Sequence, residues 1–521
     1  MGYFFQDDWK LTSKLTLNLG LRYEFDIPRW ETLNRMSYWD LDAAAPIQVP
    51  GYDLKGVFKF VNDQRRSPFD GDYDNFSPRL GFAYALNNKT TIRGGWALLY
   101  QLSRSTVFGH TGAGFNVNAQ PVFTLDSGAT LYARLDNPYR DGMLLPPGSA
   151  NGDRTYLGLG AGTILPTNNR NPEYYSWNFS VQREMPWQSV LEVNYTGSRG
   201  AHLFVPYTSL TPLDPQYWSL GRNALQAQVP NPFFGKITDP LAVNMNRPTI
   251  QRYRLFRPMT QFDGASMGTS EPPAGDSFYH ALQVKWEKRF THGLTFLGHY
   301  TWSKLIDDSS VSSGNLTWLG GTTSLQNPLN RHLEKSISAH DIAHRVVLTG
   351  AYGLPFGRNR AIGGGSGRVL DAFIGGWEVS GFLTLQGGNP LQLALNGGNI
   401  WNGSQRPNLI GDPSTKGTVA SRLDGYFNIA AFSRPDIDTF GTAARYLDYR
   451  GPGIMTLDAA LLKSWGTREG QRFEFRLEAT NATNTPIFGD PASTFGASNF
   501  GVISGTKIGS RNVQLGFKYY F

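Results

Sequence analysis

The sequence predicts an all-β fold, an antiparallel transmembrane β-barrel of the outer-membrane type. Apolar residues recur at every second position in many segments, and the connections between these segments are alternately short and long. Composition agrees, because the chain holds 59 Gly, 33 Phe, 24 Tyr and 13 Trp but few long runs of helix formers. No stretch approaches about 18 consecutive apolar residues, which excludes a membrane-spanning helix but not spanning strands.

The closing segment shows the alternation most simply. Val513, Leu515, Phe517 and Tyr519 take every second place before the final Phe521, and Gln, Gly, Lys and Tyr stand between them. A two-residue period is typical of a strand with one apolar and one polar face. With the first ten residues, the comparable segments make about 13 strands of roughly 9 to 13 residues, enough to cross an apolar band about 25 Å tall. Those segments begin at Leu15, Leu80, Ile92, Trp177, Leu191, Leu282, Leu294, Val346, Trp377, Leu457 and Phe473.

Connection lengths supply the second observation. Tight turns are predicted at 12–14, 87–89, 186–188, 291–293 and 466–470, with a Gly-rich connection at 357–368. Long loops are predicted at 27–78, 102–172, 198–276, 307–340, 397–453 and 482–510. A soluble sandwich gives no reason for strict alternation, whereas an outer-membrane barrel has short periplasmic turns and long extracellular loops.

This orientation predicts two girdles of aromatic residues at the two membrane interfaces, where a ring and its polar edge are both satisfied. The last strand then descends and places Phe521 at the periplasmic rim. The expected outer girdle consists of Tyr23, Phe25, Tyr100, Tyr195, Tyr300 and Trp302, and the inner one of Trp9, Phe290, Trp465, Tyr519 and Phe521.

Charge and composition exclude several functions. The formal net charge of +7 comes from basic residues that are scattered singly, which argues against a nucleic-acid partner. The chain has no cysteine, so disulfide scaffolds, thiolate metal sites and cysteine nucleophiles are excluded. The first residues, MGYFFQDDWK, show neither the basic nor the apolar region of a signal peptide.

Motifs for catalysis are missing, so we expect no enzyme and no cofactor. His340 and His344 would lie about 13 Å apart on a strand, too far to share a metal ion. Adjacent Asp307 and Asp308 would face opposite sides, which argues against a catalytic pair. The glycine runs at 158–162 and 363–367 are expected to be flexible loops without a helix behind them. Five loop tryptophans are tentative ligand contacts, although packing within long loops explains them better: Trp30, Trp39, Trp218, Trp318 and Trp401.

Several segments carry a family resemblance. YFFQDDWKLTSKLTLNLGLRYEF resembles the barrel hairpin of TonB-dependent outer-membrane receptors. HDIAHRVVLTGAYGLPFG, GGWEVSGFLTLQGGNP, RPNLIGDP and FEFRLEATNATNTPIFGDP are similar to Oar-like members, and together these segments extend over the whole chain. The resemblance implies uptake of a large nutrient, driven by the TonB complex, and a terminal aromatic strand that the barrel assembly machinery reads. Outer-membrane lipid and lipopolysaccharide are the other implied partners.

The resemblance also implies parts that this sequence lacks. Such receptors have a signal peptide, a plug with the TonB-contact segment, and a barrel of about 22 strands. We therefore expect residues 1–521 to be the C-terminal part of the barrel, with contact to TonB made through the missing N-terminal region. The substrate cannot be read from the loops. The alternatives are a non-transporting outer-membrane protein, such as an adhesin or an assembly factor, and a soluble carbohydrate-binding multi-domain β protein.

Overall fold

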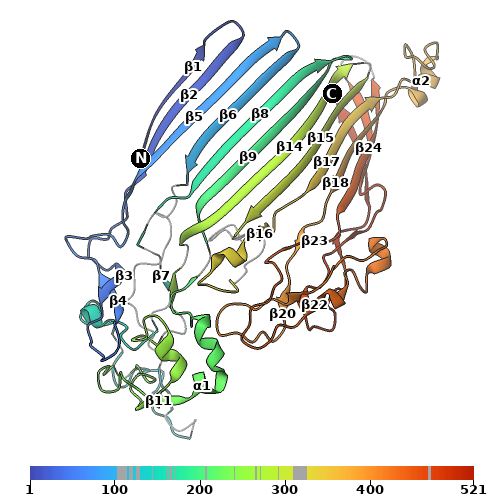
Figure 1. The fold of residues 1–521 in the computed structure, drawn as a ribbon. Helices are drawn as coiled ribbons and strands as arrows, with labels where there is room; N and C mark the ends of the chain where they lie inside the picture. The colour runs from blue at the N-terminus through green and yellow to red at the C-terminus, as the bar shows by residue number, and fades with distance from the viewer. Residues whose placement is uncertain are drawn as a thin grey trace.

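The computed structural model contains one large antiparallel sheet in which thirteen strands follow one another in their order along the chain, and a short fourteenth strand, Ser336–Ile337, pairs with one of them off this path (Figure 1). It describes residues 1–101, 114–115, 121–124, 129–143, 145–160, 163–164, 167–168, 170–205, 208–239, 241–263, 267–269, 272–291, 293–308, 325–466 and 471–521. The thirteen strands, in sheet order, are β1 (Gly2–Lys10), β2 (Leu15–Asp26), β5 (Asp72–Asn87), β6 (Thr90–Tyr100), β8 (Glu173–Met185), β9 (Ser189–Phe204), β14 (Pro273–Thr291), β15 (Leu294–Asp307), β17 (His344–Gly353), β18 (Trp377–Gln386), β24 (Ile454–Gly466), β25 (Arg472–Thr480) and β29 (Asn512–Tyr520).

The predicted strands are confirmed, and so are the tight turns at 12–14, 87–89 and 186–188. Residues 467–470 of the predicted turn at 466–470 and the centre of the one at 291–293 lie outside the described residues, as do parts of the long loops at 102–172, 198–276 and 307–340. Between β8 and β9 the chain reverses within three residues, and Trp187 and Gln188 adopt positive φ values of 61° and 55° to close the turn. The pairing then continues without a break from Met185 opposite Ser189 to Glu173 opposite Ala201. In the part of the chain that the structure describes, the tight turns lie at one end of the sheet and the long connections at the other (Figure 1).

Some loop boundaries differ from the prediction. β9 runs to Phe204 and stays paired with β14 as far as Pro273, through two register shifts. The sequence gives no sign of this because alternation stops at Gly197. β18 ends at Gln386, so the following loop begins about ten residues earlier than the predicted 397.

The register puts apolar and polar side chains on opposite faces. Val181, Val193 and Val284 lie in one row across three strands. On the other face the neighbouring row consists of Gln182, Glu192 and Lys285. Within the described residues the apolar face carries no second protein layer, and many of its side chains are exposed to the surroundings. They include Phe5, Trp9, Leu80, Trp96, Phe179, Trp286, Trp302, Val379, Phe473, Leu515 and Phe517.

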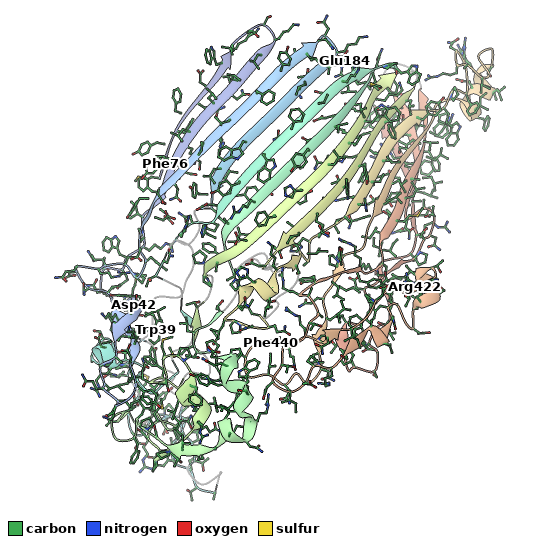
Figure 2. All side chains as sticks on the ribbon, viewed as in Figure 1. Trp39, Asp42, Phe76, Glu184, Arg422 and Phe440 are labelled. Atoms are coloured by element: carbon green, nitrogen blue, oxygen red, sulfur yellow. The ribbon has the colours of Figure 1, made fainter. Side chains whose placement is uncertain are left out.

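The buried hydrophobic clusters lie in the long loops instead. One cluster gathers around Phe427 and Phe432 in the β18–β24 loop, and another around Phe233 and Met245 in the β9–β14 loop. A third centres on Trp39. Trp39 and Phe440 are seen far from the sheet in Figure 2, whereas Phe76 lies on it. A soluble protein would bury the apolar face of its sheet first, so this distribution fits a sheet whose apolar face meets lipid.

The loops hold short elements of their own. The strands are β3 (Ser37–Ala44), β4 (Lys55–Phe60), β7 (Thr163–Ile164), β10 (Thr208–Ser209), β11 (Gln228–Pro230), β12 (Thr249–Gln251), β13 (Gly268–Thr269), β16 (Ser336–Ile337), β19 (Pro390–Leu391), β20 (Ala394–Leu395), β21 (Asn408–Leu409), β22 (Phe432–Ser433), β23 (Leu447–Arg450), β26 (Ile487–Phe488), β27 (Thr494–Phe495) and β28 (Thr506–Ile508). The helical pieces are α1 (Arg222–Gln226) and the 3-10 turns η2 (Gly152–Arg154), η3 (Pro215–Leu220), η4 (Arg252–Phe256), η7 (Arg331–Glu334), η8 (Val419–Arg422) and η9 (Ile429–Ala431).

One prediction about the Gly-rich connection is wrong. The run GGGSG at 363–367 is followed directly by a helix, α2 (Arg368–Ile374). Two of the three side chains that bind the backbone carbonyls at the end of this helix, Lys463 and Trp465, lie 88 and 93 residues away in sequence, so no local pattern indicates them. None of the helices in the described part of the chain is long and apolar enough to cross a membrane.

The sheet is open. Among the described residues no pairing joins β1 to β29, and these two strands are its edges. Since neighbours are antiparallel and thirteen is an odd number, β1 and β29 run in the same direction. Every residue of β1 is exposed, and β29 is exposed except at Gly516.

Candidate functional site

The polar face of the sheet forms the first part of the candidate site. Its side chains bind one another across strands, as where Arg93 donates to Gln182 at 2.9 Å and Asn18 donates to Asp8 at 2.6 Å. The longest chain of charges is on β25, where Glu474 contacts both Arg472 (3.4 Å) and Arg476. Such a face provides a hydrophilic wall along the whole height of the sheet.

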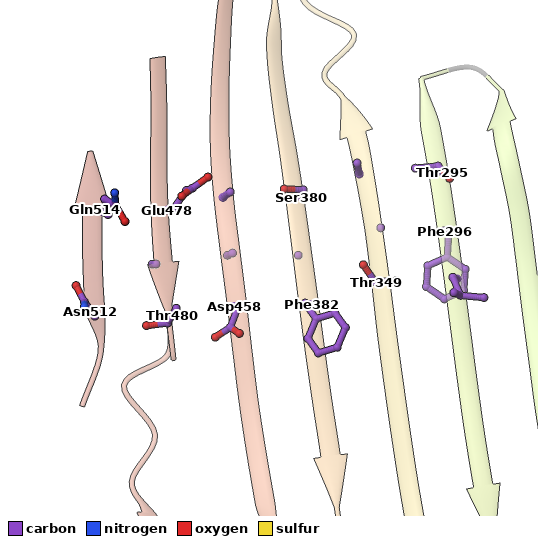
Figure 3. Close-up of a pocket in the computed structure, with 17 residues that line it drawn as sticks. Thr295, Phe296, Thr349, Ser380, Phe382, Asp458, Glu478, Thr480, Asn512 and Gln514 are labelled. Atoms are coloured by element: carbon purple, nitrogen blue, oxygen red, sulfur yellow. The ribbon is translucent and has the colours of Figure 1, made fainter. Parts of the chain in front are cut away.

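A hollow of about 550 Å³ lies on this face, over β15 to β29 (Figure 3). It exists because side chains at its centre are small, as at Ala351, Ser380 and Ala460, while longer ones stand around them. Both carboxylates in its lining have partners: Asp458 accepts from the backbone N–H of Asn481 at 2.8 Å, and Glu478 lies 3.6 Å from Arg476. The rest of the lining combines small and apolar residues, among them Phe296, Leu297 and Phe382, with neutral polar side chains. The neutral polar side chains include Thr295, Thr349, Thr480, Asn512 and Gln514.

Most residues predicted for the outer girdle lie on the apolar face toward the long loops, and Tyr195 is the exception. Tyr23 stacks on Phe76 of the neighbouring strand, with ring centroids 4.6 Å apart, and contacts Phe25 at 5.6 Å. Tyr300 and Trp302 continue this face on β15, where the hydroxyl of Tyr300 bonds Nδ1 of His344 at 2.9 Å. Tyr100 closes β6, whereas Tyr195 lies nearer mid-strand, opposite Phe179 and Leu282.

The inner set lies beside the tight turns. Phe473 stacks on Tyr519 at 4.6 Å, Phe475 contacts Phe517 at 5.1 Å, and Tyr519 contacts the terminal Phe521 at 5.9 Å. Phe290 is exposed at the end of β14, as Trp9 is near the end of β1. Trp465 differs, because its indole N–H donates to the carbonyl of Ala372 at 2.7 Å.

The loop tryptophans separate into two groups. Trp39 and Trp218 are 3% and 5% exposed, and their rings pack within loop cores, so they are not available to stack on a ligand. Trp401 is partly buried against Tyr253, at 5.1 Å. Trp30 is 52% exposed with the guanidinium of Arg66 3.9 Å over its ring. Trp318 lies outside the described residues.

Buried ion pairs join two of the outer loops to the sheet. Arg445, in the β18–β24 loop, is 1% exposed and pairs with Asp307, the last residue of β15. The same guanidinium donates to the carbonyl of Asp307 at 2.8 Å and to that of Glu334 at 2.9 Å. A nearby pair joins Arg450 to the fully buried carboxylate of Asp341, which also accepts the backbone N–H of Leu305.

A third buried pair joins Arg406 to Glu334 at 2.7 Å, with side chains 8% and 0% exposed. The 3-10 turn η7 presents Glu334, and the side chain of Asn330 caps that turn by accepting from His332. Gln326 contacts both residues of this pair. Its backbone N–H donates to the carboxylate of Glu334 at 2.8 Å, and its side-chain oxygen accepts from the backbone N–H of Arg406 at 2.8 Å. The β15–β17 and β18–β24 loops therefore act as one interlocked unit.

Burial also perturbs a phenol in this unit. Tyr426 lies in the hydrophobic cluster of the β18–β24 loop and donates its hydroxyl to the carbonyl of Arg450 at 2.9 Å. Desolvation is the main cause that raises the pKa of Tyr426 to about 12, helped by the nearby Tyr449. The phenol therefore stays neutral in any physiological medium.

The acidic and histidine pairs singled out in the sequence are accounted for by ordinary contacts. Asp308 contacts Arg331 at 3.4 Å, and Asp307 is held by Arg445. His344 bonds Tyr300 at the start of β17. Within the described ranges, no group of three or more His, Asp or Glu is placed to hold a metal ion. Sequence reasoning did not find Glu334, Arg406 or Arg445, and no local pattern marks them.

The chain was compared with curated proteins and with solved structures. No curated protein matches the chain. Similar solved structures include the ferripyoverdine receptor of the outer membrane of Pseudomonas aeruginosa (11% identity, TM-score 0.40), covering 100% of this chain and 38% of that one. They also include the ferric-catecholate import receptor Fiu from K12 E. coli (11%, 0.40; 100% and 44%) and the FrpB iron transporter from Neisseria meningitidis (10%, 0.39; 100% and 45%). The chain thus spans less than half of each of these receptors.

The family match decides the class of the protein. The family described as the outer membrane beta barrel domain matches residues 1–514, nearly the whole chain. This match confirms the barrel fold and the membrane location that alternation and loop lengths predict. The chain belongs to the outer membrane beta barrel domain family and is a protein of the cell outer membrane.

Proposed function

We propose that this chain forms part of a TonB-dependent, Oar-like outer-membrane receptor that takes up a large nutrient. The observation that carries the proposal is the combination of a polar inner wall with loops interlocked at one mouth of that wall. Loops joined by buried ion pairs provide a fixed surface for capture, and a hydrophilic wall provides a route for a solute. The sequence segments shared with Oar-like receptors support the same assignment.

We further propose that residues 1–521 are the C-terminal part of a larger barrel. A fully antiparallel ring needs an even number of strands, and because β1 and β29 run in the same direction they could pair only as parallel neighbours, against the antiparallel order of the rest of the sheet. Unpaired strand edges in hydrocarbon are costly, because each free N–H and C=O loses its hydrogen bond. Additional strands beside β1 and β29 would remove this cost. A plug encoded in the same N-terminal region as those strands would couple the barrel to TonB.

Uptake measurements test the transport proposal. Cells with and without the gene are given labelled ferric siderophores, cobalamin, oligosaccharides and peptides, and accumulation is measured with TonB present or deleted. We expect at least one compound to require both the gene and TonB. Gene-dependent accumulation that survives loss of TonB would contradict the proposal, and a defect in surface attachment without any uptake defect would favour an adhesin.

The larger barrel is tested separately on the coding sequence. We expect an open reading frame that continues upstream of Met1 into strand-forming and plug-like sequence. A stop codon directly upstream, with no such frame, would show that this chain must complete its wall in another way, for instance with further copies of itself.

A further inference from the structure

The helix α2 occupies an unusual place for part of a periplasmic turn. It belongs to the connection between β17 and β18, at the end of the sheet where the tight turns lie, and it stands off the wall beside β18 and β24 (Figure 1). The side chains that hold it are Trp377, Lys463 and Trp465. Lys463 belongs to the apolar row that continues through Phe475 and Phe517, so α2 lies on the outer face of the wall.

The wall holds α2 by the carbonyl groups at its C-terminal end. The indole N–H of Trp465 donates to the carbonyl of Ala372 at 2.7 Å, and that of Trp377 donates to the carbonyl of Phe373 at 2.8 Å. The ammonium of Lys463 donates to the carbonyl of Gly375. These are the groups that a helix leaves without partners at its end, and a cation there also complements the helix dipole.

The contact between Lys463 and α2 keeps a charged side chain away from lipid. A lysine in an apolar row is costly where it meets hydrocarbon. Here Lys463 is 1% exposed, and its ammonium lies 5.4 Å and 5.3 Å from the rings of Trp377 and Trp465, under α2. The helix therefore covers the charged residue of this row, and the hydrogen bond from Lys463 helps to hold the helix against the wall.

The other side of α2 has no protein partner among the described residues. Val369, Leu370 and Phe373 are 76%, 53% and 73% exposed. Phe373 is four residues after Val369 and three after Leu370, so the three side chains lie on one face of the helix. The same connection carries three exposed arginines, Arg358, Arg360 and Arg368, of which Arg368 directly precedes Val369. The connection thus presents both apolar side chains and cations.

We propose that this face of α2, with the arginines of 357–368, is a binding surface for phospholipids in the periplasmic leaflet of the outer membrane. The surface is continuous with the lipid-facing side of the wall and lies level with Trp465, Phe473 and Tyr519, where an interfacial aromatic belt is expected. Apolar side chains enter the region between headgroups and acyl chains, while the arginines bind phosphates. The turn is then an interfacial anchor and not a free periplasmic loop.

Site-directed spin labelling tests the proposal, and the absence of cysteine in the chain makes each label unique. Cysteine replaces Leu370 or Phe373 in the full chain, which is reconstituted into vesicles of phosphatidylethanolamine and phosphatidylglycerol. Collision rates of the nitroxide with oxygen and with a water-soluble nickel chelate are compared. Leu348, in the lipid-facing row of β17, is the apolar control, and Asn88, in the tight turn between β5 and β6, is the aqueous control.

We expect labels at Leu370 and Phe373 to show an oxygen-to-nickel ratio that is shifted from the Asn88 value toward the Leu348 value. Replacing all three arginines by glutamine, or phosphatidylglycerol by phosphatidylcholine, should move the ratio back toward Asn88. A ratio equal to that of Asn88 in every vesicle would overturn the proposal. Low collision rates with both reagents would overturn it as well, because they indicate burial against protein. If Leu348 itself gave the aqueous value, the membrane insertion of the wall, and with it the proposal, would fail.

Discussion

The pair between Glu334 and Arg406 provides a test of how the outer loops are held. Changing Glu334→Gln keeps the shape and the acceptor oxygen for Gln326 but removes the negative charge opposite Arg406. Both side chains are almost fully buried, so the guanidinium is left in the loop core without its counter-charge. Breaking a buried ion pair in this manner costs about 3 to 5 kcal/mol.

The lost free energy should increase the fraction of molecules in which these two loops are open. Since about 1.4 kcal/mol corresponds to a factor of ten in an equilibrium constant, the open fraction of the two loops should rise roughly 100-fold to several thousand-fold. When opening is fast compared with cleavage, proteolysis follows this fraction. Limited proteolysis of the membrane-inserted protein, with cut sites identified by mass spectrometry, should show faster cleavage within 325–343 and 387–453.

Two further variants sharpen the result. Asp53→Asn removes a pair with Lys55 whose side chains are 85% and 58% exposed, and we expect a change of less than about 1 kcal/mol there. Combining Glu334→Gln with Arg406→Met removes both charges and should recover much of the protection. Cleavage of Glu334→Gln at the wild-type rate, with its mass and fold unchanged, would show that the buried ion pair does not hold these loops.

Three more predictions concern the wall and the loop cores. Leu348→Lys, on the lipid-facing row, should lower the free energy of unfolding by about 2 to 4 kcal/mol, as measured by urea unfolding from vesicles, whereas Thr349→Lys on the polar face should leave it nearly unchanged. Equal losses of stability would contradict the assignment of faces. Trp39→Ala should destabilise its loop core by about 3 to 5 kcal/mol, and Trp30→Ala by less than about 1 kcal/mol, as read from loop proteolysis; the reverse order would be incompatible with their burial. The pKa of Tyr426 is raised to about 12, so the stability that its neutral phenol gives the loop is complete below the ordinary phenol pKa and is lost as pH rises through 12. Subtracting the phenolate absorbance titration of Tyr426→Phe from that of the wild type should therefore leave a titration with its midpoint near 12. A midpoint at the ordinary phenol pKa would count against burial of this side chain.

Much of the wall could be predicted because its information is local. The alternation from Leu15 to Phe25 specifies both the strand and the side that each residue faces, since neighbouring side chains on a strand point in opposite directions. The tight turns at 87–89 and 186–188 are also visible in a few letters, and the structure places them there. Strand ends beyond the apolar band, such as Phe204, were not predicted because alternation is no longer required outside lipid.

The sequence by itself determined the strands, their faces, their order and the membrane that they cross, because hydrocarbon imposes the same two-residue rule on every segment. Only the tertiary structure decided how the loops and α2 are held. Arg445 is 138 residues from Asp307, and Arg406 is 72 from Glu334, while Trp465 lies 93 residues from Ala372. Such contacts follow no periodic pattern in the sequence. They form because strand pairing in the wall brings segments that are distant in the chain side by side.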